Sequence, residues 1–181
     1  MFRHFSILLS IALLCGGCSA VSRPTASFNS VTIRDVNTKG FIMNVKIDVH
    51  NPNSVAIPLT NVDYSLALAG SKLIDRAKFN PGGDIPAKGT STVTLPIPLT
   101  FENLLSVEES IRNADGNLKY GIEAALDFDT GLPVIGMQRV PFNYDGTLNV
   151  TELLKKNWST ILASPTAKEL AKRVLGGLLN F

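Results

Sequence analysis

Cysteine is scarce in this chain, and charge of either sign is modest. Both cysteines, Cys15 and Cys18, lie close to the N-terminus, so the rest of the chain can form no disulfide and must be stabilised by packing. The 17 Lys and Arg residues nearly balance the 15 Asp and Glu residues, which leaves no basic surface for nucleic acid. Charged residues make up 18% of the chain and apolar residues 45%. This composition excludes an intrinsically disordered hydrophilic chain.

Catalytic and metal-binding motifs are also missing. Past the N-terminal segment there is a single histidine, His50, and a lone histidine on the polar face of a strand is more often solvated than catalytic. No G-x-S-x-G sequence offers a serine nucleophile, and no His/Cys spacing would hold a metal. The segment 127–131 superficially resembles a calcium loop but lacks the third acidic ligand and the terminal Glu. The sequence therefore predicts a non-enzymatic protein without metal or cofactor.

The N-terminal segment has the layout of an export signal. Arg3 and His4 precede an apolar run from Phe5 to Leu14, which ends in small residues. Such a charged start, short apolar core and small-residue end are typical of a secretory signal peptide. The run is shorter than the roughly 20 apolar residues of a membrane-spanning helix. Residues 1–17 are therefore predicted to be removed.

The end of this segment, Leu13-Leu14-Cys15-Gly16-Gly17-Cys18-Ser19, resembles the lipobox of bacterial lipoproteins. The resemblance implies that Cys18 is the first mature residue and carries the lipid anchor. The usual Leu three residues before the modified Cys is replaced by Cys15, and the alternative is an ordinary signal peptide cleaved nearby, for instance after Ala20. Ser19 after the Cys implies the periplasmic face of the outer membrane if the host is Gram-negative. Residues 18–27 are small and polar, and we interpret them as a tether.

Alternation of apolar and polar residues predicts strands over most of the remaining chain. In the clearest example, residues 41–50, the apolar side chains of Met43, Val45 and Ile47 share one face, as in an antiparallel sheet with one buried side. Pro96 and Pro98 predict that their strand lies at a sheet edge or contains a bulge. The other predicted strands are residues 28–36, 62–68, 72–74, 90–101, 118–128 and 140–144. Strands of this kind with turns between them predict a two-sheet sandwich.

Two segments depart from this alternation and read as helical. Residues 102–114 carry a helical apolar stripe with Thr100 as a candidate N-cap. The C-terminal tail, residues 151–181, carries a second stripe that includes Trp158 and Leu162, and Ser164 or Thr166 can begin its second helix. The tail either packs on the sandwich or contacts membrane or a partner through Trp158, Lys155 and Lys156.

The order of these segments resembles a known family. Ile47-Asp48-Val49-His50-Asn51-Pro52-Asn53 is similar to the strand and NPN signature of the type 2 late-embryogenesis-abundant family, also called the water stress and hypersensitive response domain. Downstream, residues 63–70, 85–90, 93–99, 101–105 and 140–146 agree with it in the same order. The resemblance covers residues 28–150 and leaves out the tail.

The resemblance implies a fibronectin-III-like or immunoglobulin-like antiparallel sandwich with one inserted helix and an association with water stress. It brings no catalytic residues. Asn51, Pro52 and Asn53 would be structural, because Pro ends the strand and Asn side chains hydrogen-bond loop backbone; a binding role is the alternative. The favoured function is a membrane-anchored, non-catalytic stress-protection lipoprotein of the cell envelope. The second hypothesis is an envelope module that binds a protein or lipid partner.

Overall fold

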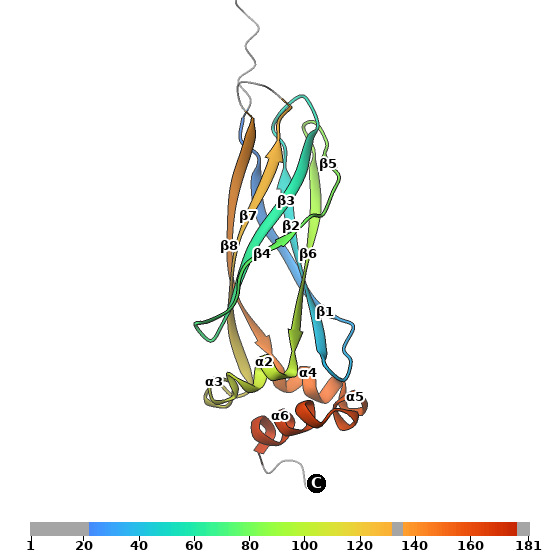
Figure 1. Ribbon diagram of the computed structural model, residues 1–181, viewed down its shortest axis with the longest axis vertical. Helices are drawn as coiled ribbons and strands as arrows, with labels where there is room; N and C mark the ends of the chain where they lie inside the picture. Colours follow the sequence, from blue (N-terminus) through green and yellow to red (C-terminus); the bar gives the residue numbers. More distant parts are fainter. Residues whose placement is uncertain (1–21, 132–135, 177–181) are drawn as a thin grey trace, which may run out of the picture.

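The computed structural model describes residues 22–131 and 136–176, and it shows two antiparallel sheets facing each other along an elongated body (Figure 1). The first sheet contains, in order, β1 (Thr25–Arg34), β2 (Gly40–His50) and β6 (Thr90–Thr100). The second contains, in order, β4 (Ser71–Phe79), β3 (Ile57–Leu68), β7 (Asn117–Asp129) and β8 (Met137–Asn149), and short β5 (Asp84–Ile85) pairs with β3. The predicted antiparallel sandwich is confirmed.

The alternation in the sequence becomes the two faces of each strand. Along β2, Val45 and Ile47 are fully buried while the intervening Lys46 is partly exposed. Burying one such face against the opposite sheet is the main source of stability in a sandwich. β6 lies at the outer edge of its sheet. Pro96 and Pro98 lack a backbone N–H, and at an edge this costs no hydrogen bond because no further strand lies on that side.

The first strand starts earlier than its sequence indicates. Residues 25–27, which we assigned to the tether, pair with the end of β2, with Thr25 opposite His50. Their small polar side chains lack an apolar alternation, so only the pairing with β2 reveals them as strand. The chain therefore enters the sandwich within a few residues of Cys18, which itself lies outside the described residues.

The β3–β4 hairpin turn falls where the sequence predicts it, at Ala69 and Gly70. Both residues have positive φ, 49° and 81°, as the two central positions of a type I′ turn require. β4 then runs to Phe79, well beyond the predicted residues 72–74, and its pairing with β3 is interrupted by register shifts. These irregularities explain why the alternation along β4 is weak.

The inserted helix is two short helices, α2 (Phe101–Leu105) and α3 (Glu108–Asn113), rather than one. Thr100 is the N-cap of α2 as predicted, and it forms a capping box with Asn103: the Thr100 hydroxyl accepts from the Asn103 N–H while the Asn103 side chain accepts from the Thr100 N–H. This arrangement satisfies donors that a helix start leaves open.

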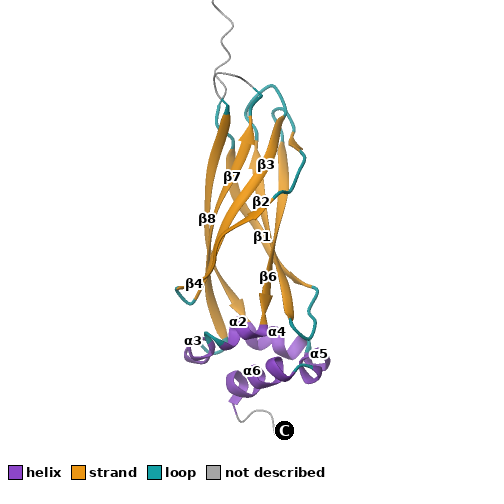
Figure 2. Ribbon diagram, in the orientation of Figure 1, coloured by secondary structure: helices purple, strands orange, loops and turns teal. Residues whose placement is uncertain are grey.

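The C-terminal tail forms α4 (Val150–Lys156), α5 (Trp158–Ala163) and α6 (Pro165–Leu175). Together with α2 and α3 these helices cover one end of the sandwich (Figure 2). Leu154, Ile161 and Leu170 are fully buried there, so the stripe at helical spacing packs on the body. Leu162, which we placed on that stripe, is instead 49% exposed. The stripe predicts one continuous helix, but α4 ends at its C-cap, Asn157, and α5 presents a different face to the body. Within residues 22–131 and 136–176, none of the helices has the length and apolar character needed to cross a bilayer.

Candidate functional site

The Asn51-Pro52-Asn53 segment, called here the NPN loop, follows the last residue of β2. Asn51 is fully buried, and its side-chain nitrogen donates to the carbonyls of Val55, Ile85 and Pro86 at 2.8, 3.2 and 3.2 Å. Its side-chain oxygen accepts from the backbone N–H and the side-chain nitrogen of Asn53, at 2.9 and 3.0 Å. A buried amide satisfied at both ends is what a polar group needs to be tolerated in a core. Asn51 thus joins the NPN loop to the β5 segment.

The Asn53 side chain binds the start of the described chain. Its side-chain oxygen accepts from the Ser22 N–H at 2.8 Å, and its side-chain nitrogen donates to the Ser22 carbonyl at 2.8 Å. This two-point contact imitates a strand pairing and fixes where the chain enters the sandwich. The Lys88 ammonium donates to the Pro52 carbonyl, and the Lys88 N–H donates to the Asn53 carbonyl at 2.8 Å.

These contacts show what the NPN loop does in the fold. Both asparagine amides are engaged with the protein's own backbone, and Asn51 is 0% and Asn53 7% exposed. The arrangement ties the incoming chain, the end of β2 and the β5 region into one cluster. This is the geometry expected if the signature is structural, and that role stays a prediction.

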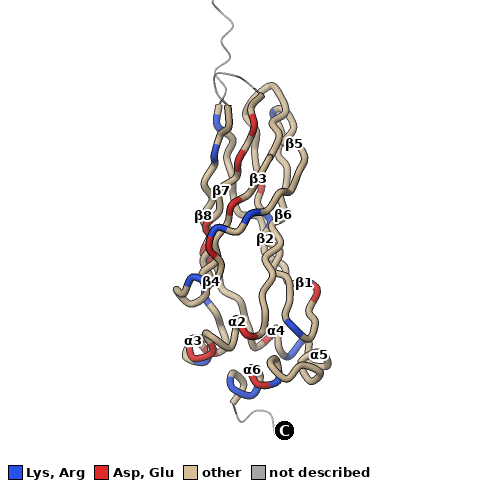
Figure 3. The backbone as a smooth tube through the Cα atoms, in the orientation of Figure 1, with Lys and Arg blue, Asp and Glu red and all other residues tan. Residues whose placement is uncertain are grey.

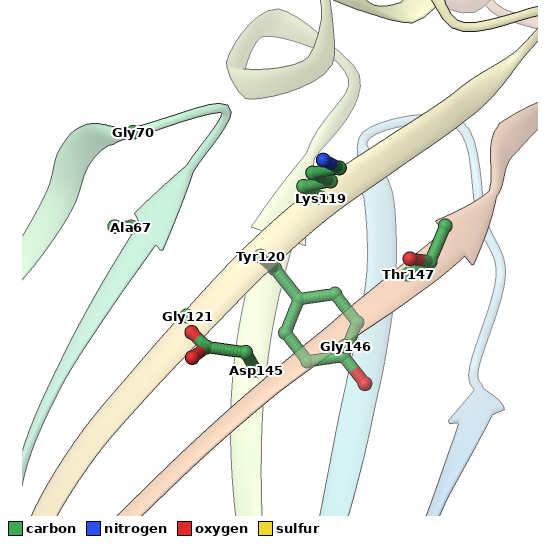
Figure 4. A pocket seen from close by; sticks show the side chains of 8 residues that line it. All are labelled: Ala67, Gly70, Lys119, Tyr120, Gly121, Asp145, Gly146 and Thr147. Carbon is green, nitrogen blue, oxygen red and sulfur yellow. The ribbon is translucent and has the colours of Figure 1, made fainter.

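An open hollow of about 430 Å³ lies on the second sheet, over β3, β7 and β8 (Figure 4). It exists because residues there are small: Ala67 and Gly121 line it, and a Cβ on Gly121 would come within 2.9 Å of the Asp145 carboxylate. Lys119 and Asp145 bring one charge of each sign to its lining, which contains neither histidine nor cysteine. Burial raises the pKa of Tyr120, which also lines it, to about 12, so its phenol stays protonated at neutral pH. The hollow can accept a polar group but holds no nucleophile paired with a base.

Further along the same sheet, Arg139 of β8 joins two carboxylates on neighbouring strands. Its guanidinium lies 3.0 Å from the Asp127 carboxylate of β7 and 2.7 Å from the Asp63 carboxylate of β3. Asn61 donates to the Asp63 carboxylate at 2.7 Å. Hydrogen bonds hold the pKa of Asp63 below its usual range, and the bond from Arg139 contributes more than the bond from Asn61. This cluster links β3, β7 and β8 and so helps to fix their register.

The tail residues that we singled out lie at the opposite end of the molecule from the NPN loop. Lys155 and Lys156 are exposed on α4, and the Lys155 ammonium is 3.9 Å from the Glu152 carboxylate. Trp158 is partly buried and packs against the core cluster. The structure therefore does not bring the NPN loop and the tail residues together (Figure 1). Cys18 falls outside the described residues.

His50 and the acidic residues at the end of β7 have ordinary surroundings. The exposed His50 ring lies 3.2 Å from the Thr90 hydroxyl across the β2–β6 pair. The Asp129 carboxylate accepts from the Gly131 N–H at 2.9 Å, as in a turn. Among the residues that the structure describes, no group of three or more His, Cys, Asp or Glu side chains is placed to hold a metal ion.

Sequence reasoning missed the Arg139 cluster and the hollow at Gly121. Period-2 alternation places Asp63, Asp127 and Arg139 on the polar faces of their strands. It does not say which residues stand side by side, since that depends on the β3–β7–β8 register. The only signal for the hollow was the presence of small residues, Ala67 and Gly121, on polar faces.

The sandwich belongs to a class of small β-sandwich proteins that is represented among solved structures. An Arabidopsis thaliana protein solved in solution is 25% identical, with a TM-score of 0.58, over 72% of this chain and 83% of that one. A putative late embryogenesis abundant protein, also solved in solution, is 22% identical with a TM-score of 0.55, over 79% of this chain and 83% of that one.

Sequence comparison gives the family within that class. The family model described as late embryogenesis abundant protein matches residues 46–146, and this chain belongs to the type 2 late-embryogenesis-abundant family. A desiccation protectant protein Lea14 homologue from Glycine max is 30% identical over 72% of this chain and 84% of its own length. A desiccation-related protein from Craterostigma plantagineum is 31% identical over 74% of this chain and 85% of its own length. The NPN loop lies inside the matched region, whereas α4, α5 and α6 follow it.

Proposed function

We propose that this chain is a non-catalytic stress-protection protein that acts against water loss while held at a membrane of the cell envelope by a lipid on Cys18. The observation that carries the protective role is the similarity to desiccation-related proteins, which extends over most of the chain and of each relative. The anchor rests on the lipobox resemblance at Cys18. Two or more acyl chains hold a protein firmly, whereas one holds it only marginally.

The surface of the sandwich offers a physical basis for protection. Both sheets turn polar side chains outward, and charges of both signs are spread along the strands (Figure 3). The Asp48 carboxylate, for example, already accepts from the Thr92 hydroxyl at 2.6 Å and from the Asn29 side chain at 2.8 Å. Such groups can replace lost water at the surface of a neighbouring protein or headgroup. Held close to the membrane, they would act at high effective concentration.

The experiment that tests the protective role is a drying assay with the unlipidated chain from Ser19 to Phe181. A drying-sensitive enzyme is dried with this protein and rehydrated, and its recovered activity is compared with that in an equal mass of an inert globular protein. We expect clearly better recovery with this protein. Recovery equal to the control would contradict intrinsic protection.

The alternative function is an envelope module that binds a protein or lipid partner, and the hollow over β3, β7 and β8 is the observation that favours it. Gly121→Val would fill part of this hollow, and the Cβ that it adds would meet only the end of the Asp145 side chain. A single stoichiometric partner that is recovered from solubilised membranes with the wild type and lost with Gly121→Val would support the binding module. Equal recovery of background proteins with both would leave the protective function as the better account.

A further inference from the structure

Three chain segments meet at the end of the sandwich that lies farthest from the helices (Figure 1). They are the start of β1, the β2–β3 connection of residues 51–56, and the paired ends of β7 and β8 at Asp129 and Met137. The pairings of Thr25 with His50 and of Asp129 with Met137 place these segments at one end. We call this end the entry end, because the described chain begins there.

The entry end must lie close to any lipid carried by Cys18. Four residue steps separate Cys18 from Ser22, and a fully extended chain of that length spans about 14 Å. Ser22 is held by both ends of the Asn53 amide, so its position is fixed to the body of the sandwich. The helical end lies at the far side of β8, a strand of 13 residues, or about 40 Å away. The short connection therefore gives the sandwich a definite polarity relative to the bilayer.

The entry end also exposes apolar side chains. Val55 is 54% and Met137 59% exposed, and among the described residues the third large apolar side chain of this kind is Leu162, at the helical end. The neighbouring Ala56 is exposed as well. Exposed charges of both signs lie at this end, with Arg23 and Lys88 in loops and Asp84 and Asp129 in β5 and β7.

The sides of the sandwich, in contrast, are poor surfaces for lipid. The outer face of the second sheet carries the carboxylates of Asp63, Glu123 and Asp145. The outer face of the first sheet carries polar side chains such as Asp48 and Thr92. Lying flat would remove water from these carboxylates and polar groups, and taking charged groups out of water is costly even where, as at Asp63, they are paired. Standing on the entry end brings Val55 and Met137 against the bilayer, and removing water from these apolar side chains is favourable.

We propose that the entry end is a membrane-docking surface, on which the sandwich stands with Val55 and Met137 against the lipid headgroups and its helical end directed away from that bilayer. This inference rests on the proposed lipid anchor at Cys18. It also gives the NPN loop a second role. The contact between Asn53 and Ser22 keeps the tether short, and a short tether holds the body upright on the bilayer. This orientation also places Trp158, Lys155 and Lys156 about 40 Å from the anchoring membrane.

Single labels on the full-length, cell-processed protein test the orientation. Once Cys15 is removed with the signal and Cys18 is acylated, a new cysteine is the only free thiol of the chain. Val55→Cys at the entry end and Leu162→Cys at the helical end replace similarly exposed side chains and form a matched pair. Each is labelled with a nitrobenzoxadiazole fluorophore and reconstituted into phosphatidylcholine vesicles with or without a headgroup spin-labelled lipid.

We expect the spin label to quench the Val55→Cys probe severalfold and to leave the Leu162→Cys probe unchanged. Equal quenching of the two probes, or stronger quenching at Leu162→Cys, would overturn the orientation while leaving the anchor intact. Labelling stoichiometry and intact mass report the anchor separately. An intact mass without lipid on Cys18, whether Cys18 is retained as a second labelled thiol or is removed by cleavage after Ala20, would overturn the anchor, and the docking proposal with it.

Discussion

At the scale of single residues, Asn51 shows how a buried amide can hold separate segments together. Its side-chain nitrogen donates to three backbone carbonyls on two segments, and its oxygen accepts from Asn53. Its contacts explain why an amide, with two donors and an acceptor on one planar group, suits this position. Neither a carboxylate nor a hydroxyl offers that combination.

The variant Asn51→Ala tests this role. It leaves buried carbonyls and the Asn53 side chain without their partner, and each such loss costs roughly 1–3 kcal/mol. We expect the free energy of unfolding, measured by urea denaturation, to fall by about 3 kcal/mol. Asn143→Ala, at an exposed position of β8, is the control and should change little. Similar urea midpoints for the two variants would contradict the role assigned to Asn51.

The Arg139 cluster makes a prediction about pH. Hydrogen bonds from Arg139 and Asn61 lower the pKa of Asp63 in the folded state. A lowered folded pKa stabilises the protein fully above the unfolded value, near 3.9, and the gain is lost as the pH falls through the folded value. Arg139→Gln should therefore lower the thermal midpoint at pH 7 by about 2 °C, and the difference from wild type should shrink toward acid pH.

The exposed pair of Lys72 and Asp75, 3.2 Å apart with both side chains more than half exposed, provides the comparison. Lys72→Gln should leave the thermal midpoint nearly unchanged at every pH, because exposed single pairs contribute little. A pH-independent loss in Arg139→Gln would show that its guanidinium acts through packing rather than through charge.

At the scale of elements, the long strands could be predicted because each buries one face. The apolar residues of β2, β3, β6 and β7 recur every second position, and the structure places them in the core. The same reasoning fails where burial is incomplete. The first residues of β1 and most of β4 are edge segments with mixed faces, so pairing with a neighbouring strand, and not a local pattern, makes them strands.

The candidate site could likewise be predicted only in part from the sequence. The NPN loop could be recognised from adjacent residues, yet its partners Ser22, Ile85 and Pro86 are more than 30 positions away in the chain. Arg139 and Asp63 are 76 positions apart. Local sequence indicates which residue types can form such contacts, whereas the register of the sheets decides which ones do.

Ser164 links the helical tail to the sandwich and gives a prediction at this scale. Its hydroxyl donates to the Thr38 carbonyl at 2.6 Å and accepts from the Ala167 N–H at 3.2 Å as the N-cap of α6. Ser164→Ala removes both contacts in a buried position, and loss of the cap alone costs about 1 kcal/mol. We expect a urea-measured loss of about 2 kcal/mol. Ser159→Ala, exposed on α5, should change stability by much less; an equal loss in both would argue against the link.

At the scale of the whole molecule, the two ends of the sandwich have different characters. The entry end holds the NPN loop, the start of the described chain and the exposed Val55 and Met137. The opposite end is covered by helices whose apolar residues, apart from the exposed Leu162, pack against the body. This polarity places the proposed attachment and the exposed lysines of the tail, which the sequence alone could not separate, at opposite ends of the molecule. In our proposal, attachment belongs to the entry end, and the exposed Lys155 and Lys156 lie at the opposite end of the molecule.

The same polarity sharpens the test of the anchor itself. Cys18→Ser should leave the urea midpoint unchanged but move the protein from the membrane fraction to the soluble fraction, since the acyl chains supply the attachment. Deleting the tail would be a poor control, because Leu154 and Leu170 are buried in the body. Reversing the exposed charges in Cys18→Ser with Lys155→Glu and Lys156→Glu tests the tail without disturbing the fold. If Cys18→Ser stays with the membrane and the triple variant is released, the tail rather than a lipid holds the protein there. If both variants stay with the membrane, the lipid anchor and the tail contact are both contradicted.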